Sequence, residues 1–397
     1  MFTTLVKQSN RKYDPSTQGD RRITRGAGRP RPKELNHLFV NNVRFWCMLS
    51  IVAMHAVQAV LLVPSHAQLG ILLTTPFKFA TIGFFLISGF LLGERVDRRD
   101  PVDYFMRRVK KVFIPWSLWF CLMSLTIGVE ETAPVHGPHT WPPLSIVYWA
   151  ARSTLMNTSF WFVPNLLFSI AILLIFRRHL YSLRFGAVLL AANLVYVVNI
   201  YTLWFSARHT QAIFGFVFYL WLGSYIAHNF ERISAWLARI PTAVCATLAL
   251  VTGAASYGET RLLFALHKPD ALSTLRFTTQ MFSLCMVLWI FKFSRATWPS
   301  FIDVRRHTFG IYLAHSIVMQ VLARLEIFAT WRTGSVYQAD AEGILLWIVL
   351  SVATYSWCLV ITSWLANQSL FQWTVGLAPD EALRLQNAQP GIANGVC

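Results

Sequence analysis

Long apolar runs, separated by short charged segments, constrain this chain more than any other feature. Of the 397 residues, 55% are hydrophobic and 13% are charged, whereas about a quarter of a soluble domain is charged. A helical run of about 20 apolar residues crosses the hydrocarbon core, whereas membrane β-strands are shorter and alternate in polarity. We therefore predict an all-α, polytopic membrane protein with about ten transmembrane helices. The predicted spans are residues 37–63, 75–92, 112–128, 164–176, 185–201, 212–227, 242–257, 276–291, 308–328 and 344–365.

Basic residues gather in alternate connections between these runs. With both termini cytoplasmic, the inner segments hold 26 of the 35 Lys and Arg residues and the outer ones hold 7; the other two are Arg44 and Lys78. The positive-inside rule favours this orientation. It also explains the net charge of +17, so nucleic acid is not an expected partner. We predict a basic, disordered cytoplasmic tail over residues 1–36, a transmembrane domain over 37–366 and a short cytoplasmic tail over 367–397.

The first predicted span carries two ionisable residues, Arg44 and His55. At about 100° and 1.5 Å per residue, both side chains lie on one face, roughly 16 Å apart along the axis. An ionisable residue within the membrane usually faces a cavity or a partner, because leaving it unpaired in hydrocarbon is costly. Arg44 alone would suit a topology anchor, and His55 alone a structural hydrogen bond. Their shared face predicts the floor of an active site.

Two connections carry further structural signals. Asp100, followed by Pro101, predicts the start of a helix. The mixed basic and apolar segment Tyr104 to Phe113 predicts a helix at the inner interface, with a bend into the third span at Pro115. In the long outer connection, the semi-apolar stretch 146–156 predicts a re-entrant or interfacial helix above the site.

Four polar or aromatic positions near span ends allow a structural and a functional interpretation. Ser88 beside Gly89 suits close helix packing, and also a polar wall of the site. Trp161 suits an interfacial aromatic belt or a sugar-stacking position. Lys78 and Arg276 lie near outer ends, where their charges could meet an anionic acceptor, although we expect them to snorkel toward the head groups.

Five motifs, in chain order, resemble those of the acyltransferase 3 family, the membrane O-acyltransferases of bacterial surface polysaccharides. They are Arg44, ten residues and then His55; Ser-Gly-Phe at 88–90; the basic stretch 104–115; Phe-Trp-Phe-Val at 160–163; and Gly-Ile-Tyr-Leu-Ala-His at 310–315. The resemblance covers about residues 41–315. This chain has Asn41 where many members have Asp. It also has Arg107-x-x-Lys110 and Arg108-x-x-Lys111 in place of Arg-x-x-Arg.

The resemblance implies transfer of an acyl group, most simply acetyl, from cytoplasmic acyl-CoA to a hydroxyl of a cell-surface or lipid-linked carbohydrate. The expected location is the bacterial inner membrane. His55 would be the general base, a role that suits a neutral imidazole. Arg44 would be the second catalytic residue and would help to hold the donor. The other predicted donor-binding residues are Arg107, Arg108, Lys110 and Lys111, and the predicted pocket residues are Ser88, Trp161, Tyr312 and His315.

Acetyl-CoA or another acyl-CoA is therefore the expected donor, and no metal is expected. The expected partners are a carbohydrate or glycolipid acceptor and membrane lipids, and a homo-oligomer is left open. An alternative function is a transporter or flippase of a glycolipid or small anionic substrate, with Arg44 and His55 along its path. Against this alternative, the sequence has no repeated half and no paired Gly/Pro-broken helices.

Overall fold

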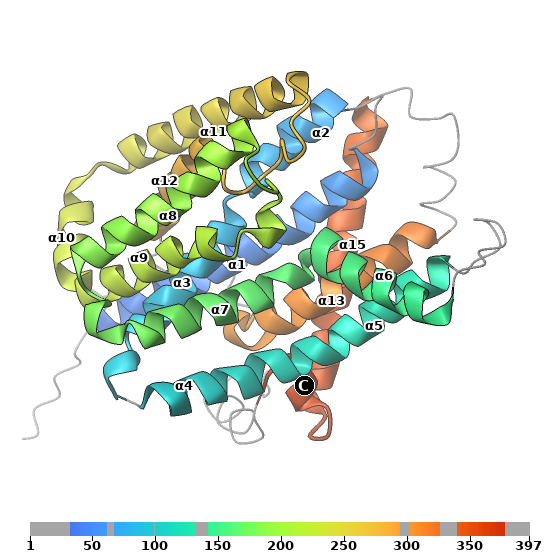
Figure 1. Cartoon of the computed structure of the whole chain (residues 1–397), viewed down its shortest axis with the longest axis horizontal. Helices are drawn as coiled ribbons and strands as arrows, with labels where there is room; N and C mark the ends of the chain where they lie inside the picture. The colour runs from blue at the N-terminus through green and yellow to red at the C-terminus, as the bar shows by residue number, and fades with distance from the viewer. Residues whose placement is uncertain are drawn as a thin grey trace, which may run out of the picture.

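The computed structural model describes residues 32–61, 67–98, 100–131, 142–293, 302–325 and 340–377. Within these ranges the regular elements are helices and none is a strand (Figure 1). Most of the predicted basic tail over residues 1–36 lies outside the described residues, as does residue 378 onward. The α-helices are α1 Pro32–Val60, α2 Ala67–Thr74, α3 Ala80–Gly93, α4 Pro101–Arg108, α5 Ile114–Glu131, α6 Pro143–Asn157, α7 Phe162–Ile175, α8 Leu183–Thr202, α9 Val217–His228, α10 Phe230–Arg239, α11 Thr242–Ala265, α12 Phe277–Phe293, α13 Val304–Arg324 and α15 Asp340–Asn367.

Every predicted span coincides with one of these helices, but the helices differ in length and apolarity. Five described helical stretches are long and apolar enough to cross a membrane. Two further helix pairs, each bent sharply at a short break, raise this number to seven if each pair is one span. The chain is therefore all-helical and multi-pass within the described ranges. Ten spans and the cytoplasmic position of both ends stay predictions.

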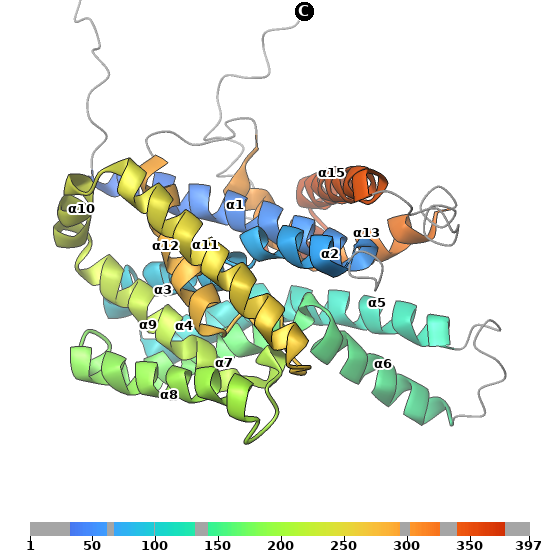
Figure 2. The same ribbon diagram turned by 90° about the horizontal axis from the view of Figure 1, so that it is seen from above.

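Helix α1 packs against α3, α13 and α15. Figures 1 and 2 show that α15 crosses α1 instead of running beside it. Trp347 of α15 donates its indole N–H to the Ala53 carbonyl of α1 over 2.9 Å, two residues before His55 in sequence. Because a buried indole N–H needs an acceptor, this bond fixes how the two helices cross. The middle of α1 is thereby held in a defined position.

Helices α3 and α9 approach each other through glycine. A Cβ atom on Gly89 would collide with the Leu220 carbonyl of α9, and one on Gly223 would collide with the Leu86 carbonyl of α3. Ser224 completes the contact by donating its hydroxyl to the Gly89 carbonyl over 2.8 Å. Small residues permit such close helix contacts within membranes. The predicted packing role of Gly89 is confirmed, and it sets the position of the neighbouring Ser88.

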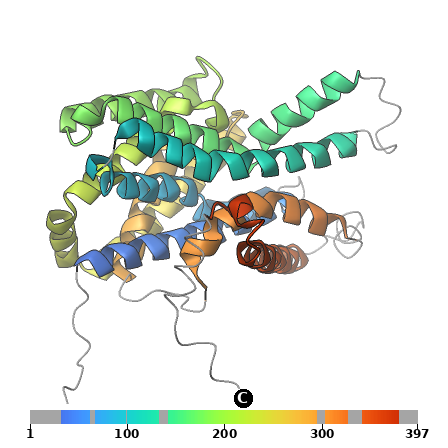
Figure 3. The same ribbon diagram turned by 90° about the horizontal axis from the view of Figure 1, so that it is seen from below.

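Helices α4 and α5 form one continuous rod from Pro101 to Glu130, which differs from the predicted bend at Pro115 (Figures 1 and 3). The predicted start is confirmed, because the Asp100 carboxylate accepts from the backbone N–H groups of Val102 and Asp103. A π-helical segment, Val109–Phe113, joins the two helices. Proline breaks a helix because its ring collides with the carbonyl four residues earlier. The wider π turn shifts this carbonyl, so the helix continues through Pro115.

Helices α6 and α7 are bent by 76° at a break around Thr158. The predicted helix at 146–156 is confirmed as α6, and its geometry fits a broken span or a re-entrant segment. Thr158 adopts an extended backbone, and its hydroxyl accepts from the Phe160 N–H over 3.3 Å. A 3-10 turn, Ser159–Trp161, then leads into α7. The break presents Ser159 to the centre of the bundle.

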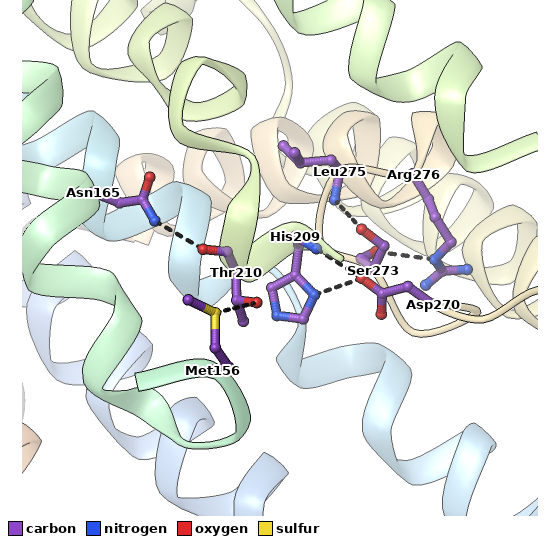
Figure 4. A network of polar contacts seen from close by, with 8 residues as sticks. All are labelled: Met156, Asn165, His209, Thr210, Asp270, Ser273, Leu275 and Arg276. Atoms are coloured by element: carbon purple, nitrogen blue, oxygen red, sulfur yellow. Dashed lines mark hydrogen bonds and ion pairs between the residues drawn. The ribbon is translucent and has the colours of Figure 1, made fainter. Parts of the chain in front are cut away.

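A buried polar cluster ties the connection before α9 to the one before α12 (Figure 4). Asp270 accepts from the His209 ring over 2.8 Å and from the His209 backbone N–H over 2.9 Å. Although burial opposes ionisation, these His209 interactions lower the pKa of Asp270 to about 2. Nearby, Arg276 is fully buried and donates to the Ser273 carbonyl, while Lys78 is 4% exposed. The predicted snorkelling of Lys78 and Arg276 is therefore wrong, because buried oxygens and Asp270 compensate their charges.

Candidate active site

Two cavities lie at different levels of α1. The first has a volume of about 450 Å³ and is lined by His55, together with residues of α5, α6, α13 and α15; we call it the His55 cavity. The second has a volume of about 900 Å³ and is lined by Arg44, together with residues of α3, α4, α7 and α13; we call it the cationic cavity. The sequence predicted that Arg44 and His55 share a face. In the structure each of them lines a different cavity beside α1.

His55 is partly buried, and its ring is held by one side chain of its own helix. Its Nδ1 atom lies 3.1 Å from the Oε1 atom of Gln58. A carbonyl oxygen only accepts, so Nδ1 carries the proton of the neutral ring and Nε2 is its acceptor nitrogen. Sequence reasoning missed Gln58, although its spacing of three residues places it beside His55 on a helix. The arrangement suits a general base that acts through Nε2.

His315 lies next to His55, with 5.4 Å between the ring centroids. It is fully buried, and its Nδ1 atom donates to the Tyr312 carbonyl over 2.6 Å. Ser316 Oγ lies 3.4 Å from its Nε2 atom and 2.8 Å from Ser159 Oγ. Both serines line the His55 cavity. The structure thus brings the predicted His315 to the catalytic candidate from a distant part of the sequence.

Tyr312 connects the linings of the two cavities. It lines the cationic cavity, and its hydroxyl donates to the Ser159 carbonyl over 2.7 Å. Ser159 lines the His55 cavity on the other side. Phe162 packs against the Tyr312 ring, with 5.6 Å between their centroids, and also lines the cationic cavity. The two cavities are therefore neighbours, linked by this aromatic residue and its hydrogen bond.

The cationic cavity collects every residue predicted to bind a donor. No acidic residue is among the described residues that line it. Arg107 is partly compensated, because its Nε atom donates to both carboxylate oxygens of Asp103 over 2.9 Å. Like charges held together in a cleft favour an anionic ligand. The cations of the lining are Arg44, Arg95, Arg107, Arg108, Lys110, Lys111 and Arg305.

The remaining predicted residues divide between the cavities and the core. Ser88 lines the cationic cavity. Trp161 is 8% exposed, lines neither of the two cavities, and packs against Phe162, His209 and Phe216. Within the described ranges, no group of three or more His, Cys, Asp and Glu side chains could hold a metal ion.

Comparison with protein-family models supplies the class of chemistry. The acyltransferase domain of the acyltransferase 3 family matches residues 37–363, which is most of the chain. Searches of curated proteins and of solved structures returned no significant match. The matched range contains α1 with its two ionisable residues, both cavities and Tyr312. On this evidence the chain belongs to the acyltransferase 3 family and is a multi-pass membrane acyltransferase.

Proposed function

We propose that this protein is an O-acyltransferase of the bacterial inner membrane. It moves an acyl group, most simply acetyl, from cytoplasmic acyl-CoA to a hydroxyl of a cell-surface or lipid-linked carbohydrate. One observation supports this most strongly. The same helix offers a cation-lined cavity at Arg44 and an oriented imidazole at His55, in a cavity that adjoins the first.

The cationic cavity is the proposed donor site. Coenzyme A carries its phosphates at one end and its thioester at the other, joined by a flexible arm. Arginine and lysine bind phosphate well, and arginine can do so with two parallel hydrogen bonds. The roughly 16 Å of α1 between Arg44 and His55 is on the order of the length of that arm. Phosphates at Arg44 would therefore allow the thioester to reach past Tyr312 toward His55.

The His55 cavity is the proposed site of the chemical step. His55 Nε2 takes the proton of the acceptor hydroxyl while the hydroxyl oxygen attacks the thioester carbonyl carbon. The tetrahedral intermediate then collapses, the carbon–sulfur bond breaks, and the thiolate of coenzyme A takes the proton from the imidazolium. Gln58 keeps the proton on Nδ1 throughout, so that Nε2 faces the reacting atoms. The products are the acylated acceptor and free coenzyme A.

Purified protein in lipid nanodiscs, supplied with acetyl-CoA and a glycoside mixture, tests this function by release of free thiol. His55→Ala should lower kcat by about 100-fold or more, the usual contribution of a general base. The exposed His179 of the Arg177–His179 turn provides the matched control, and His179→Ala should be unaffected. Arg44→Ala should raise KM for acetyl-CoA by about 10- to 100-fold, as expected for one lost charge-assisted bond. Arg178→Ala, at an exposed site, is its control.

The same experiment separates acyl transfer from transport. A transporter or flippase would move its substrate without consuming thioester, and His55→Ala would leave the background thiol release unchanged. Thiol release that depends on the glycosides but not on His55 would refute the proposed base. Membership of an acyltransferase family favours the enzymatic function.

A further inference from the structure

The His55 cavity has a mouth built from the ends of three helices. Glu130 lies at the end of α5, Asn157 at the end of α6 and Arg324 at the end of α13, and the ends of α5 and α13 lie near each other in Figures 1 and 3. Each of these residues lines the cavity, as does Gln320 of α13. The side chains of Arg324 and Glu130 are 45% and 40% exposed. A molecule that enters toward His55 passes these polar groups.

The two charges at this mouth neutralise each other. Arg324 Nη2 forms an ion pair with one carboxylate oxygen of Glu130. Gln320 Nε2 donates to the other carboxylate oxygen over 2.6 Å, and Thr126 donates its hydroxyl to Gln320 Oε1 over 3.2 Å. Both oxygens of the carboxylate are therefore occupied. Glu130 and Arg324 are the only acid and the only Lys or Arg among the described residues that line this cavity.

The remaining polar lining consists of neutral groups. They are the amides of Gln58, Asn157 and Gln320 and the hydroxyls of Thr158, Ser159 and Ser316. Amides and hydroxyls both donate and accept, so they match the hydroxyl groups of an uncharged ligand. A carboxylate or ammonium group that enters would lose water without gaining an unpaired opposite charge. The lining of the His55 cavity therefore has no net charge from its acid and its arginine, whereas the lining of the cationic cavity has seven cations.

We infer that the His55 cavity selects an uncharged, hydroxyl-rich acceptor and discriminates against acceptors that carry a carboxylate or an ammonium group near the acylated hydroxyl. The inference rests on the proposed function. The cavity volume of about 450 Å³ lies in the lower part of the range of about 300–1,000 Å³ usual for small-ligand sites, so the bound portion spans about one or two sugar rings. The Glu130–Arg324 pair is the specificity determinant, because removal of either partner leaves the other charge without its counter-ion.

Matched pairs of glycosides test this selectivity. Methyl glucoside is compared with methyl glucuronide, and methyl N-acetylglucosaminide with methyl glucosaminide. The members of each pair share a ring, and the second carries a charge at the assay pH. Thiol release from acetyl-CoA should give a kcat/KM at least tenfold higher for the uncharged member of each pair. Equal values, or a preference for a charged member, would overturn the inference.

Two variants shift the selectivity in opposite directions. Glu130→Gln leaves Arg324 without a carboxylate and should raise the glucuronide-to-glucoside ratio at least fivefold. Arg324→Gln leaves Glu130 without a cation and should raise the glucosaminide-to-N-acetylglucosaminide ratio. Glu231→Gln, in α10 and lining neither cavity, is the control and should leave both ratios unchanged. A ratio within one preparation does not depend on how much protein is folded. Unchanged ratios in Glu130→Gln and Arg324→Gln would overturn the inference.

The inference and the proposed function fail in different ways. Thiol release that requires His55 but shows no charge preference refutes the inference and leaves the proposed function intact. If none of the four glycosides is turned over, their binding is compared by the shift each produces in the melting temperature of the nanodisc protein. The uncharged members should produce the larger shifts. Equal or absent shifts would overturn the inference.

Discussion

The hydrogen bond between His55 and Gln58 allows a quantitative prediction. Methionine has nearly the length of glutamine but no strong acceptor, so Gln58→Met removes the partner of Nδ1 while filling its space. A hydrogen bond between neutral groups contributes about 0.5–1.5 kcal/mol, and one to a charged group about 1.5–3 kcal/mol. His55 becomes charged only as it takes the proton. The bond therefore stabilises the transition state by about 1–1.5 kcal/mol more than the ground state.

This difference corresponds to a loss of about five- to tenfold in kcat for Gln58→Met, at about 1.4 kcal/mol per tenfold. KM for acyl-CoA should change little, because Gln58 lines the His55 cavity and not the cationic cavity. The assay is steady-state thiol release from acetyl-CoA in nanodiscs. Gln68→Met, at an exposed position of α2, is the matched control and should retain wild-type kcat.

A double-mutant cycle provides the decisive comparison. If Gln58 acts by holding His55, Gln58→Met should have almost no effect in a His55→Ala background. An equal loss of kcat in both backgrounds would show that Gln58 acts on the cavity in general, which would refute the reasoning. A kcat within twofold of wild type in the single variant would refute it as well.

Two further predictions concern stability. Gly89→Ala should lower the melting temperature, because the added Cβ would meet a backbone carbonyl of α9 and overpacking costs about 1–3 kcal/mol. Gly258→Ala is the control and should raise the melting temperature slightly, because a Cβ added there meets no atom within 4 Å. The opposite order of melting temperatures would contradict the packing argument. Asp270, whose pKa the His209 interactions lower to about 2, contributes stability that is present above its unfolded pKa of about 4 and is lost as the pH falls through about 2. The melting temperature of Asp270→Asn should thus lie below that of the wild type by a constant amount above pH 5. The gap should narrow as the pH falls from about 4 toward 2, and a gap that is undiminished at pH 2.5 would contradict this assignment.

Local sequence patterns were sufficient to predict most of the helices and the two ionisable residues of α1, Arg44 and His55, around which the site is built. Apolar runs predicted the helices that coincide with the ten expected spans, because membrane helices satisfy their backbone groups internally, whatever their neighbours. The short helices α2 and α10 were not predicted. The position of Arg44 among the cations of the 92–112 connection followed from charge clustering in sequence. Arg305 joins the same cavity from the start of α13, and Asp303 caps this helix through the backbone N–H groups of residues 305 and 306.

Contacts between distant segments could not be predicted in the same way. The bond from Tyr312 to the Ser159 carbonyl joins residues far apart in sequence and depends on the break between α6 and α7. The burial of Arg276 depends on acceptors from α11, namely the Ser256 carbonyl and the Thr260 hydroxyl. Neither partner follows from the hydropathy of its own segment. The π segment before Pro115 was not predicted either, since proline alone predicts a bend.

The rod formed by α4 and α5 contributes Arg108 to one cavity and Glu130 to the other, over about 30 Å of uninterrupted helix. One continuous helix therefore reaches both cavities, so a tilt of the whole rod would change both. If neutralising the cations at one end tilts the rod, the Glu130–Arg324 pair at the other end moves with it. Thermodynamic reciprocity then requires that an occupant of either cavity changes the affinity of the other cavity by the same factor. An interrupted helix at Pro115 would have uncoupled the two ends.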